Sequence, residues 1–245
     1  MSYNIHFITY GDYKYKKSRE RICQEAKDSN WFNQVKYFTH NDYDIDFYNK
    51  YKEILNIPRG GGYWIWKPYF IKTYLDNLND NDILVYIDSG CTINKNNKKE
   101  FDRYIEIVKN HKTGILGFQY TNLFYQEKKW NIQEVFDYFN VKDNTDIIDS
   151  PQILSGIQII CKKPKSIEII NKWYNVIEDN ILLFTDNYNK KQKEYFKDNR
   201  HDQSIQSVIK KIYNVPIIQN HGMDSMNNID PINNSAPFTA SRIRS

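Results

Sequence analysis

The sequence predicts an α/β protein with a mostly parallel central sheet flanked by helices on both faces. Residues 83–87 (ILVYI) are continuously apolar and rich in β-branched and aromatic side chains, which is typical of a strand buried on both faces. Strand-like and helix-like segments alternate along the chain, and this order favours a parallel sheet covered on both sides. The 245 residues contain no linker rich in Pro, Gly or Ser, so one large domain is expected.

The predicted strands are short apolar segments bounded by turn residues: 3–10, 35–39, 83–88, 114–120, 153–161 and 215–219. The predicted helices carry apolar residues at helical spacing: 18–28, 44–55, 68–78, 99–110, 131–140, 164–183 and 202–212. Residues 186–199 are charged and aromatic without a clear period, and we expect a mobile loop there. Residues 1–221 should form the folded domain. The polar tail at 222–245 should be ordered only where it touches the functional site.

Composition excludes several classes of protein. The net charge of +4 comes from basic residues scattered along the chain, whereas a nucleic-acid-binding protein needs a clustered basic face. The three cysteines form no CxxC pair, so neither a disulfide framework nor a zinc site is predicted. No apolar stretch reaches the ~18 residues of a transmembrane segment, and no signal peptide is recognisable. We therefore expect a cytoplasmic protein.

Asp88 is the first candidate for chemistry. It follows the buried strand at 83–87, and ligands of open α/β sheets bind just beyond the carboxyl ends of the strands. A carboxylate at the end of a buried strand is costly without a cation, a metal ion or hydrogen-bond donors. The alternative is an aspartate that only caps the following turn.

A second motif begins with three glycines at 60–62 and ends in Trp64, Trp66 and Lys67. Glycines beside a helix start permit close backbone approach and expose N–H groups to an anion. Lys67 would add positive charge there, and the tryptophans could stack on a base or a sugar ring. The motif is not a P-loop, because no Gly-Lys followed by Ser or Thr is present at the required spacing. Alternatively, the glycines form a flexible turn and the tryptophans belong to the core.

Two further motifs lie in the second half of the chain. Ser155 and Gly156 interrupt an apolar strand, which marks either a ligand approaching the backbone or a packing constraint against a helix. Arg200–Ser204 (RHDQS) gathers strong polar groups at the head of a helix, where Asp202 or Ser204 could also be a simple N-cap. His221, just past the last strand, is of the right type to help hold a metal ion near Asp88.

Taken in order, these motifs resemble those of GT-A-fold glycosyltransferases, which use nucleotide-sugar donors. The collinear set is Thr9-Tyr10, GYWIWKP at 62–68, YIDSGC at 86–91, LSG at 154–156 and HDQSI at 201–205. A group of bacterial and viral proteins carries such a GYWxWKP, DSGC and HDQSI series, and glycogenin-like transferases show a more distant similarity. The resemblance spans residues 3–221. It implies a catalytic domain over 1–221, working in the cytoplasm of a bacterium or a viral host.

The resemblance also implies roles for individual residues. Asp202 would stabilise the reacting sugar or act as base, and Asp88 would contact the nucleotide ribose, a metal ion or both. The residues that would hold the donor are Thr9, Tyr10, Gly62, Trp64, Lys67, Ser89, Ser155, Gly156, His201 and Gln203. The donor would be a UDP- or GDP-type sugar, and the acceptor a hydroxyl of a glycan. No nucleic acid is expected as a partner.

One departure from the family pattern concerns the metal ion, Mn²⁺ or Mg²⁺. The usual signature is Asp-x-Asp, and Gly90 stands at the second aspartate position. Three consequences remain open: weaker metal binding, a shell completed by His221 or water, or neutralisation of the phosphates by Lys67. The deficit keeps open the alternative of a nucleotide-sugar-binding module. A second alternative is a phosphohydrolase of the haloacid-dehalogenase type, because residues 88–92 (DSGCT) resemble its Asp-x-Asp-x-Thr/Val motif. The latter lacks support because its acid/base aspartate would also stand at position 90.

Overall fold

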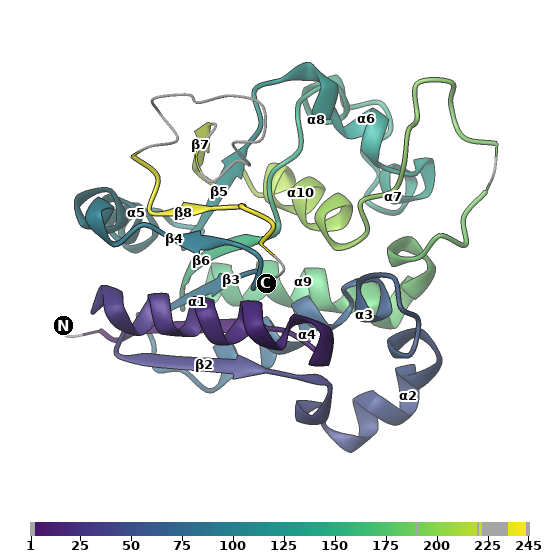
Figure 1. Cartoon of the computed structure of the whole chain (residues 1–245). Coiled ribbons are helices and arrows are strands. Elements are labelled where there is room, and N and C mark those ends of the chain that lie inside the picture. The colour runs from purple at the N-terminus through teal and green to yellow at the C-terminus, as the bar shows by residue number, and fades with distance from the viewer. Residues whose placement is uncertain (1–2, 190, 220, 222–234, 244–245) are drawn as a thin grey trace.

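The computed structural model describes residues 3–189, 191–219, 221 and 235–243. Its centre is a six-stranded sheet with the strand order β2-β1-β3-β6-β5-β7 (Figure 1). The strands are β1 (Ile5–Tyr10), β2 (Gln34–Phe38), β3 (Ile83–Ile87), β5 (Ile115–Gln119), β6 (Ile157–Cys161) and β7 (Ile217–Gln219). Each overlaps a predicted strand.

Five of these strands point the same way, and β6 is the exception. Parallel pairs join β1 to β2, β1 to β3 and β5 to β7, whereas β6 runs antiparallel to both β3 and β5. The predicted mostly parallel sheet is therefore confirmed. The strand predicted over 153–161 is shorter than expected, because Ile153 forms only an isolated bridge with Gln119 and the strand begins at Ile157. Ser155 and Gly156 thus lie at the edge of the sheet, immediately before β6.

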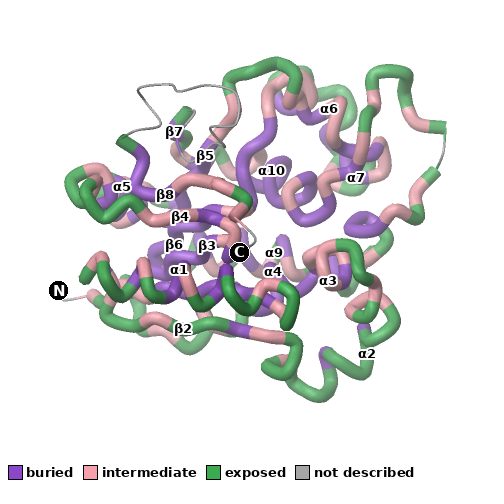
Figure 2. Tube along the Cα trace, in the orientation of Figure 1, coloured by how far each residue is buried: buried purple, intermediate pink, exposed green. Residues whose placement is uncertain are grey.

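Helices pack on both faces of the sheet, as predicted. The longer ones are α1 (Lys16–Ser29), α2 (Ile45–Leu55), α4 (Trp66–Asp76), α5 (Lys98–Asn110), α7 (Gln133–Tyr138), α9 (Pro164–Asn180) and α10 (Asp202–Ile212). Single turns that the sequence patterns did not reveal are α3 (Gly60–Tyr63), α6 (Glu127–Trp130) and α8 (Thr145–Ile148). Side chains of α1 and α5 form the core on one face, and those of α4, α9 and α10 form the core on the other (Figures 1 and 2).

Strand β3 supplies both cores in alternation, which explains its unbroken apolar sequence. Ile83, Val85 and Ile87 pack on the α1/α5 side, whereas Leu84 and Tyr86 pack on the α4/α9/α10 side. Since side chains alternate along a strand, this parity directs residue 88 toward the side of Tyr86. The face on which Asp88 emerges is therefore decided by the strand.

The described part of the C-terminal segment folds back onto the domain. Strand β8 (Phe238–Thr239) pairs with β4 (Thr92–Ile93), and the Ile243 N–H donates to the carbonyl of Gly90 at 2.9 Å. Residues 222–234 of the predicted tail lie outside the described residues. Among the residues that are described, no helix combines the length and the apolarity needed to span a bilayer.

Lys210 is a cation enclosed in the α10 side of the core. Its side chain lies among the fully buried ones, and its Nζ donates to the carbonyl of Leu116 at 3.4 Å. Within the described residues, no carboxylate forms an ion pair with it. Burial, and then the positive charge of Lys67, lower the pKa of Lys210 from 10.5 to about 7.

We predict that Lys210→Met raises the free energy of unfolding at pH 7 by about 1 kcal/mol or more, because the folded protein no longer encloses an unpaired ammonium group. The unfolded chain keeps this proton up to pH 10.5, but the folded chain releases it near pH 7. The free energy of unfolding of the unmodified protein should therefore increase relative to that of the variant as the pH rises above 7. Urea unfolding between pH 7 and 9.5 measures both effects. Lys99→Met, at an exposed position of α5, is the control, and destabilisation by Lys210→Met at pH 7 would contradict the prediction.

Candidate active site

Three charged side chains from separate elements meet at the carboxyl edge of β3. The Nζ of Lys67 lies 2.8 Å from Oδ2 of Asp202 and 3.1 Å from Oδ1 of Asp88. The side chains of Lys67 and Asp202 are 1% and 6% exposed, while that of Asp88 is 38% exposed. The structure thus brings together the two carboxylates that the sequence singled out, with one of them open to a ligand.

Each partner reaches this point for a local reason. Lys67 lies in the first turn of α4, on the face that packs against the sheet. Asp202 is the first residue of α10, which packs on the same face of the sheet as α4. Asp88 points to that face because of its parity in β3.

Lys67 is a structural cation here. Its Nζ is surrounded by the two carboxylates and by Ser155 Oγ, which lies 3.3 Å away. Burial by itself would lower the pKa of Lys67, but the attraction of Asp202 and Asp88 outweighs it, and the pKa is raised. Lys67 therefore stays charged and occupied. Neutralisation of phosphate by Lys67 stays a prediction.

Asp88 is held from two further directions. The hydroxyl of Tyr86 donates to its Oδ1, and its own N–H donates to the carbonyl of Gly156 at 2.8 Å. A Cβ on Gly156 would lie only 2.7 Å from Oδ2 of Asp88. The glycine at 156 thus allows a carboxylate, rather than an external ligand, to approach the backbone directly.

Gln203 positions the segment that precedes β6. Its Oε1 accepts from the N–H of Ser155 at 3.4 Å, and its Nε2 donates to Oε1 of Gln152 at 2.8 Å. Ser155 in turn faces Lys67. Gln203 was predicted to hold donor or acceptor hydroxyls, and its described contacts show it bridging two segments of the protein instead.

His201 is similarly occupied. Its Nδ1 contacts the carbonyl of Phe184 at 2.7 Å, which makes Nδ1 the protonated nitrogen, and its Nε2 accepts from Nε of Arg59 at 3.0 Å. Burial lowers its pKa, so the ring is neutral near pH 7. With both nitrogens engaged, His201 cannot hold a sugar hydroxyl without breaking one of these bonds. Its φ of 54° is a strained backbone conformation for a non-glycine residue.

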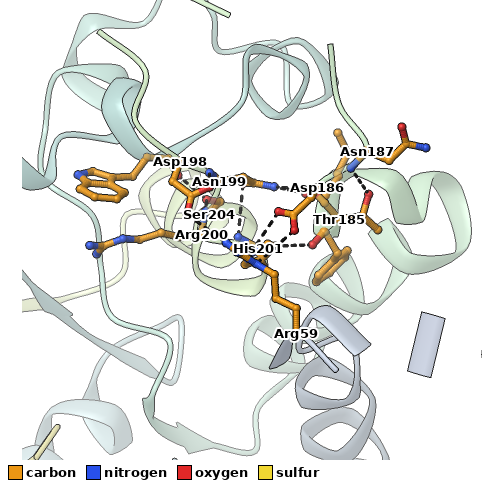
Figure 3. A network of polar contacts seen from close by, with 12 residues as sticks. Arg59, Thr185, Asp186, Asn187, Asp198, Asn199, Arg200, His201 and Ser204 are labelled. Atoms are coloured by element: carbon orange, nitrogen blue, oxygen red, sulfur yellow. Dashed lines mark hydrogen bonds and ion pairs between the residues drawn. The ribbon is translucent and has the colours of Figure 1, made fainter. Parts of the chain in front are cut away.

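Arg59 ties the 185–201 segment to the glycine motif (Figure 3). Its guanidinium lies 3.3 Å from Asp186 and 3.0 Å from Asp198, in addition to the contact with His201. The described residues of this segment form neither helix nor strand, as predicted. Arg59 was not identified as a site residue, although it directly precedes the three glycines.

The three glycines serve a backbone purpose. Residues 60–64 all have positive φ, between 53° and 94°, and therefore form a left-handed turn that glycine permits at little cost. A Cβ on Gly62 would lie 2.7 Å from Cα of Leu55, so the close approach is to the protein itself. Trp64 stacks on His201 with ring centroids 5.1 Å apart. The turn thereby connects Arg59 to α4 and directs Lys67 inward.

Thr9 and Tyr10, predicted to line a base pocket, are both buried at the end of β1. Tyr10 stacks on Trp66 with centroids 4.0 Å apart, and burial raises its pKa to about 12. Thr9 Oγ1 has no hydrogen-bond partner within the described residues. Ser89 is also buried, and its carbonyl accepts from Arg21 of α1 at 3.0 Å. These contacts fix the loop after β3, and a role in donor binding stays a prediction.

The described residues do not fit a divalent metal ion. Gly90 offers no carboxylate, and the oxygens of Asp88 already face Lys67, whose positive charge would repel a cation. The described contacts of His221 go to Tyr104 and Glu100 of α5 rather than to Asp88. No group of three or more His, Cys, Asp and Glu side chains able to hold a metal occurs in the part of the chain described.

Some residues of the site carried no sequence signal that we used. Tyr86 holds Asp88, Gln152 holds Gln203, and Arg21 holds the carbonyls of Ser89 and Cys91. Tyr86 could have been found, because it stands two residues before Asp88 and so shares its face of the strand. The contacts of Arg21 and Gln152 depend on segments remote in sequence.

We predict that Lys67→Met destabilises the protein by about 3–5 kcal/mol, because it leaves two carboxylates adjacent and Asp202 buried without a cation. Adding Asp202→Asn should recover part of this loss by removing the uncompensated charge. Lys72→Met, in the same helix but in a surface pair with Asp76, is the matched control and should cost less than about 1 kcal/mol. Urea unfolding measures all three. Equal effects of the two lysine variants would refute the role given to Lys67.

We also predict that Gly156→Ala costs about 1–3 kcal/mol, because the new methyl group would displace the carboxylate of Asp88. Gly90→Ala is the matched control. Its Cβ would meet nothing closer than Cα of Arg242 at 3.5 Å, so a change within about 0.5 kcal/mol is expected. Thermal unfolding of both variants tests the comparison, and a neutral Gly156→Ala would show that Asp88 does not pack as described.

No protein-family model matches the sequence, and neither does any curated protein. Among solved structures, the bifunctional glycosyltransferase WbbM gives a TM-score of 0.52 at 10% identity over 98% of this chain and 46% of that chain. This chain thus spans less than half of WbbM. A glycosyltransferase involved in the glycosylation of the major capsid of PBCV-1 gives 0.49 at 10% identity, over 98% and 95% of the two chains. Mouse xyloside xylosyltransferase 1 gives 0.47 at 9% identity, over 98% of each. At such identities the likeness to WbbM shows the fold alone, and this chain has a GT-A-like fold.

Proposed function

We propose that this protein transfers a sugar from a nucleoside-diphosphate donor to a hydroxyl of a glycan acceptor. The observation that carries the proposal is the pair of carboxylates, Asp88 and Asp202, held by one buried lysine at the edge of the sheet where ligands of α/β proteins bind. The fold supports the proposal, because WbbM, which shares it, is a glycosyltransferase.

The chemistry requires two kinds of charge stabilisation. The bond between the sugar C1 and the diphosphate oxygen breaks, a bond from C1 to the acceptor oxygen forms, and the acceptor proton leaves to a base. Positive charge develops on the sugar ring as the leaving group departs. Asp202 faces that charge in our proposal, since a buried carboxylate already oriented by Lys67 requires little reorganisation in the transition state. Asp88, which is more exposed, accepts hydroxyl hydrogen bonds from the donor.

A second candidate function is a binding module that holds a nucleotide sugar without turnover. The observation that favours it is Gly90, which removes the second carboxylate of the Asp-x-Asp signature. The two functions differ in one measurement. A binding module would be stabilised by nucleotides and would neither transfer nor hydrolyse the donor.

The experiment combines a ligand screen with two variants. Thermal shift with UDP, GDP and their sugars, with Mn²⁺ and with EDTA, identifies the donor because stabilisation follows occupancy. Transfer or donor hydrolysis is then measured with the donor found. Asp88→Asn and Asp202→Asn should each reduce turnover by roughly 100-fold or more, since each removes a charge at the reacting centre. Asp102→Asn, in an exposed pair with Lys98, is the control. Unchanged turnover in both site variants would exclude this site assignment.

A further inference from the structure

The guanidinium of Arg200 lies in an aromatic pocket next to the candidate active site. Its Cζ is 4.1 Å from the ring centroid of Trp130, 5.0 Å from that of Tyr125 and 6.0 Å from that of Tyr120. No carboxylate of the described residues forms an ion pair with it. Arg200 precedes Asp202 by two residues, so its backbone lies next to the proposed reacting centre. A guanidinium on aromatic rings keeps its N–H edge available for a planar anion.

Arg242 reaches the same region from the C-terminal segment. A Cβ on Gly90 would lie 3.5 Å from Cα of Arg242, and the next residue, Ile243, donates to the carbonyl of Gly90. Arg242 is exposed, and its φ of 53° is strained for a non-glycine residue. Strain of this kind persists where the surroundings impose it and occurs often at ligand sites. The position that lacks a carboxylate is therefore covered by an arginine.

Arg200 lies against Tyr120, and the positive charge of Arg242 also acts on Tyr120. Tyr120 follows β5, Gly90 follows β3 by three residues, and only β6 lies between those strands. At two strand spacings, the strand ends are roughly 10 Å apart, a distance that a diphosphate and two extended arginines can span. Both arginines lower the pKa of Tyr120 against the dominant effect of burial. Burial lowers the pKa of Arg200, and the positive charge of Arg242 adds to that effect, as expected for cations that share one site.

We propose that Arg200 and Arg242 form a phosphate-binding subsite that takes the diphosphate of the donor in place of a divalent metal ion. The inference rests on the proposed function. As the C1–O bond breaks, negative charge grows on the departing diphosphate, and two guanidinium groups stabilise it through charge-assisted hydrogen bonds. The charge of Lys67 is already balanced by Asp88 and Asp202, so this role goes to other cations in our proposal.

The test is isothermal titration of the full chain in EDTA with UDP, GDP, inorganic pyrophosphate and the nucleosides uridine and guanosine. Arg200→Gln and Arg242→Gln should each weaken binding of the preferred nucleoside diphosphate at least 10-fold and leave nucleoside binding unchanged. Arg103→Gln is the matched control, since Arg103 lies on α5 and pairs with Glu100. Arg242→Lys should retain part of the affinity by keeping the charge.

The outcomes separate the inference from the proposed function. Nucleoside diphosphate binding that is absent in EDTA and appears with Mn²⁺, or that is equal in both glutamine variants and the unmodified protein, overturns the subsite. Pyrophosphate that competes with the nucleotide supports the donor as the source of the phosphate. If pyrophosphate and the nucleotide bind at the same time, and the glutamine variants lose the binding of pyrophosphate, the subsite does not take the donor diphosphate. It would then take a phosphate group of the acceptor. Arginine-dependent nucleotide binding without sugar transfer supports the subsite and contradicts the proposed function.

Discussion

An ammonium group with almost no exposure to water stays charged in a protein core only if carboxylates and other acceptors surround it. Lys67 meets this requirement with Asp88, Asp202 and Ser155, which come from the end of β3, the start of α10 and the segment before β6. Those elements must therefore meet at one point for the protein to fold. The same contact holds both carboxylates in place, so stability and the candidate chemistry depend on one interaction.

Backbone geometry around this contact depends on glycines at two places. At Gly156 a side chain would displace the carboxylate of Asp88, and at residues 60–62 only glycines adopt the left-handed turn at little cost. In both places the close neighbour is part of the protein itself. A glycine motif that resembles an anion site in the sequence is thus explained by the packing that directs Lys67 and Arg59 inward.

The charges of the candidate site separate into an inner and an outer set. The inner set of Lys67, Asp88 and Asp202 is compensated within the protein, whereas the outer set consists of Arg200, which lies against the ring of Trp130, and Arg242, whose backbone lies against Gly90. In our proposal an anionic ligand binds to this outer set. The C-terminal segment around Arg242 covers Gly90, the position where the carboxylate is absent. In our proposal this segment supplies one of the two phosphate-binding arginines.

The sequence by itself determined the α/β class, the strands and longer helices, and the position of Asp88 at a strand end, because these follow from local periodicity and from the parity of β3. It also singled out Asp202, Lys67 and the glycines as residue types suited to a site. Only the tertiary structure decided their partners: Lys67 contacts two carboxylates, His201 is held by Arg59 and Phe184, and His221 contacts α5. The physical reason is that a contact between segments remote in sequence depends on how the sheet and helices pack, which no local pattern of residues encodes.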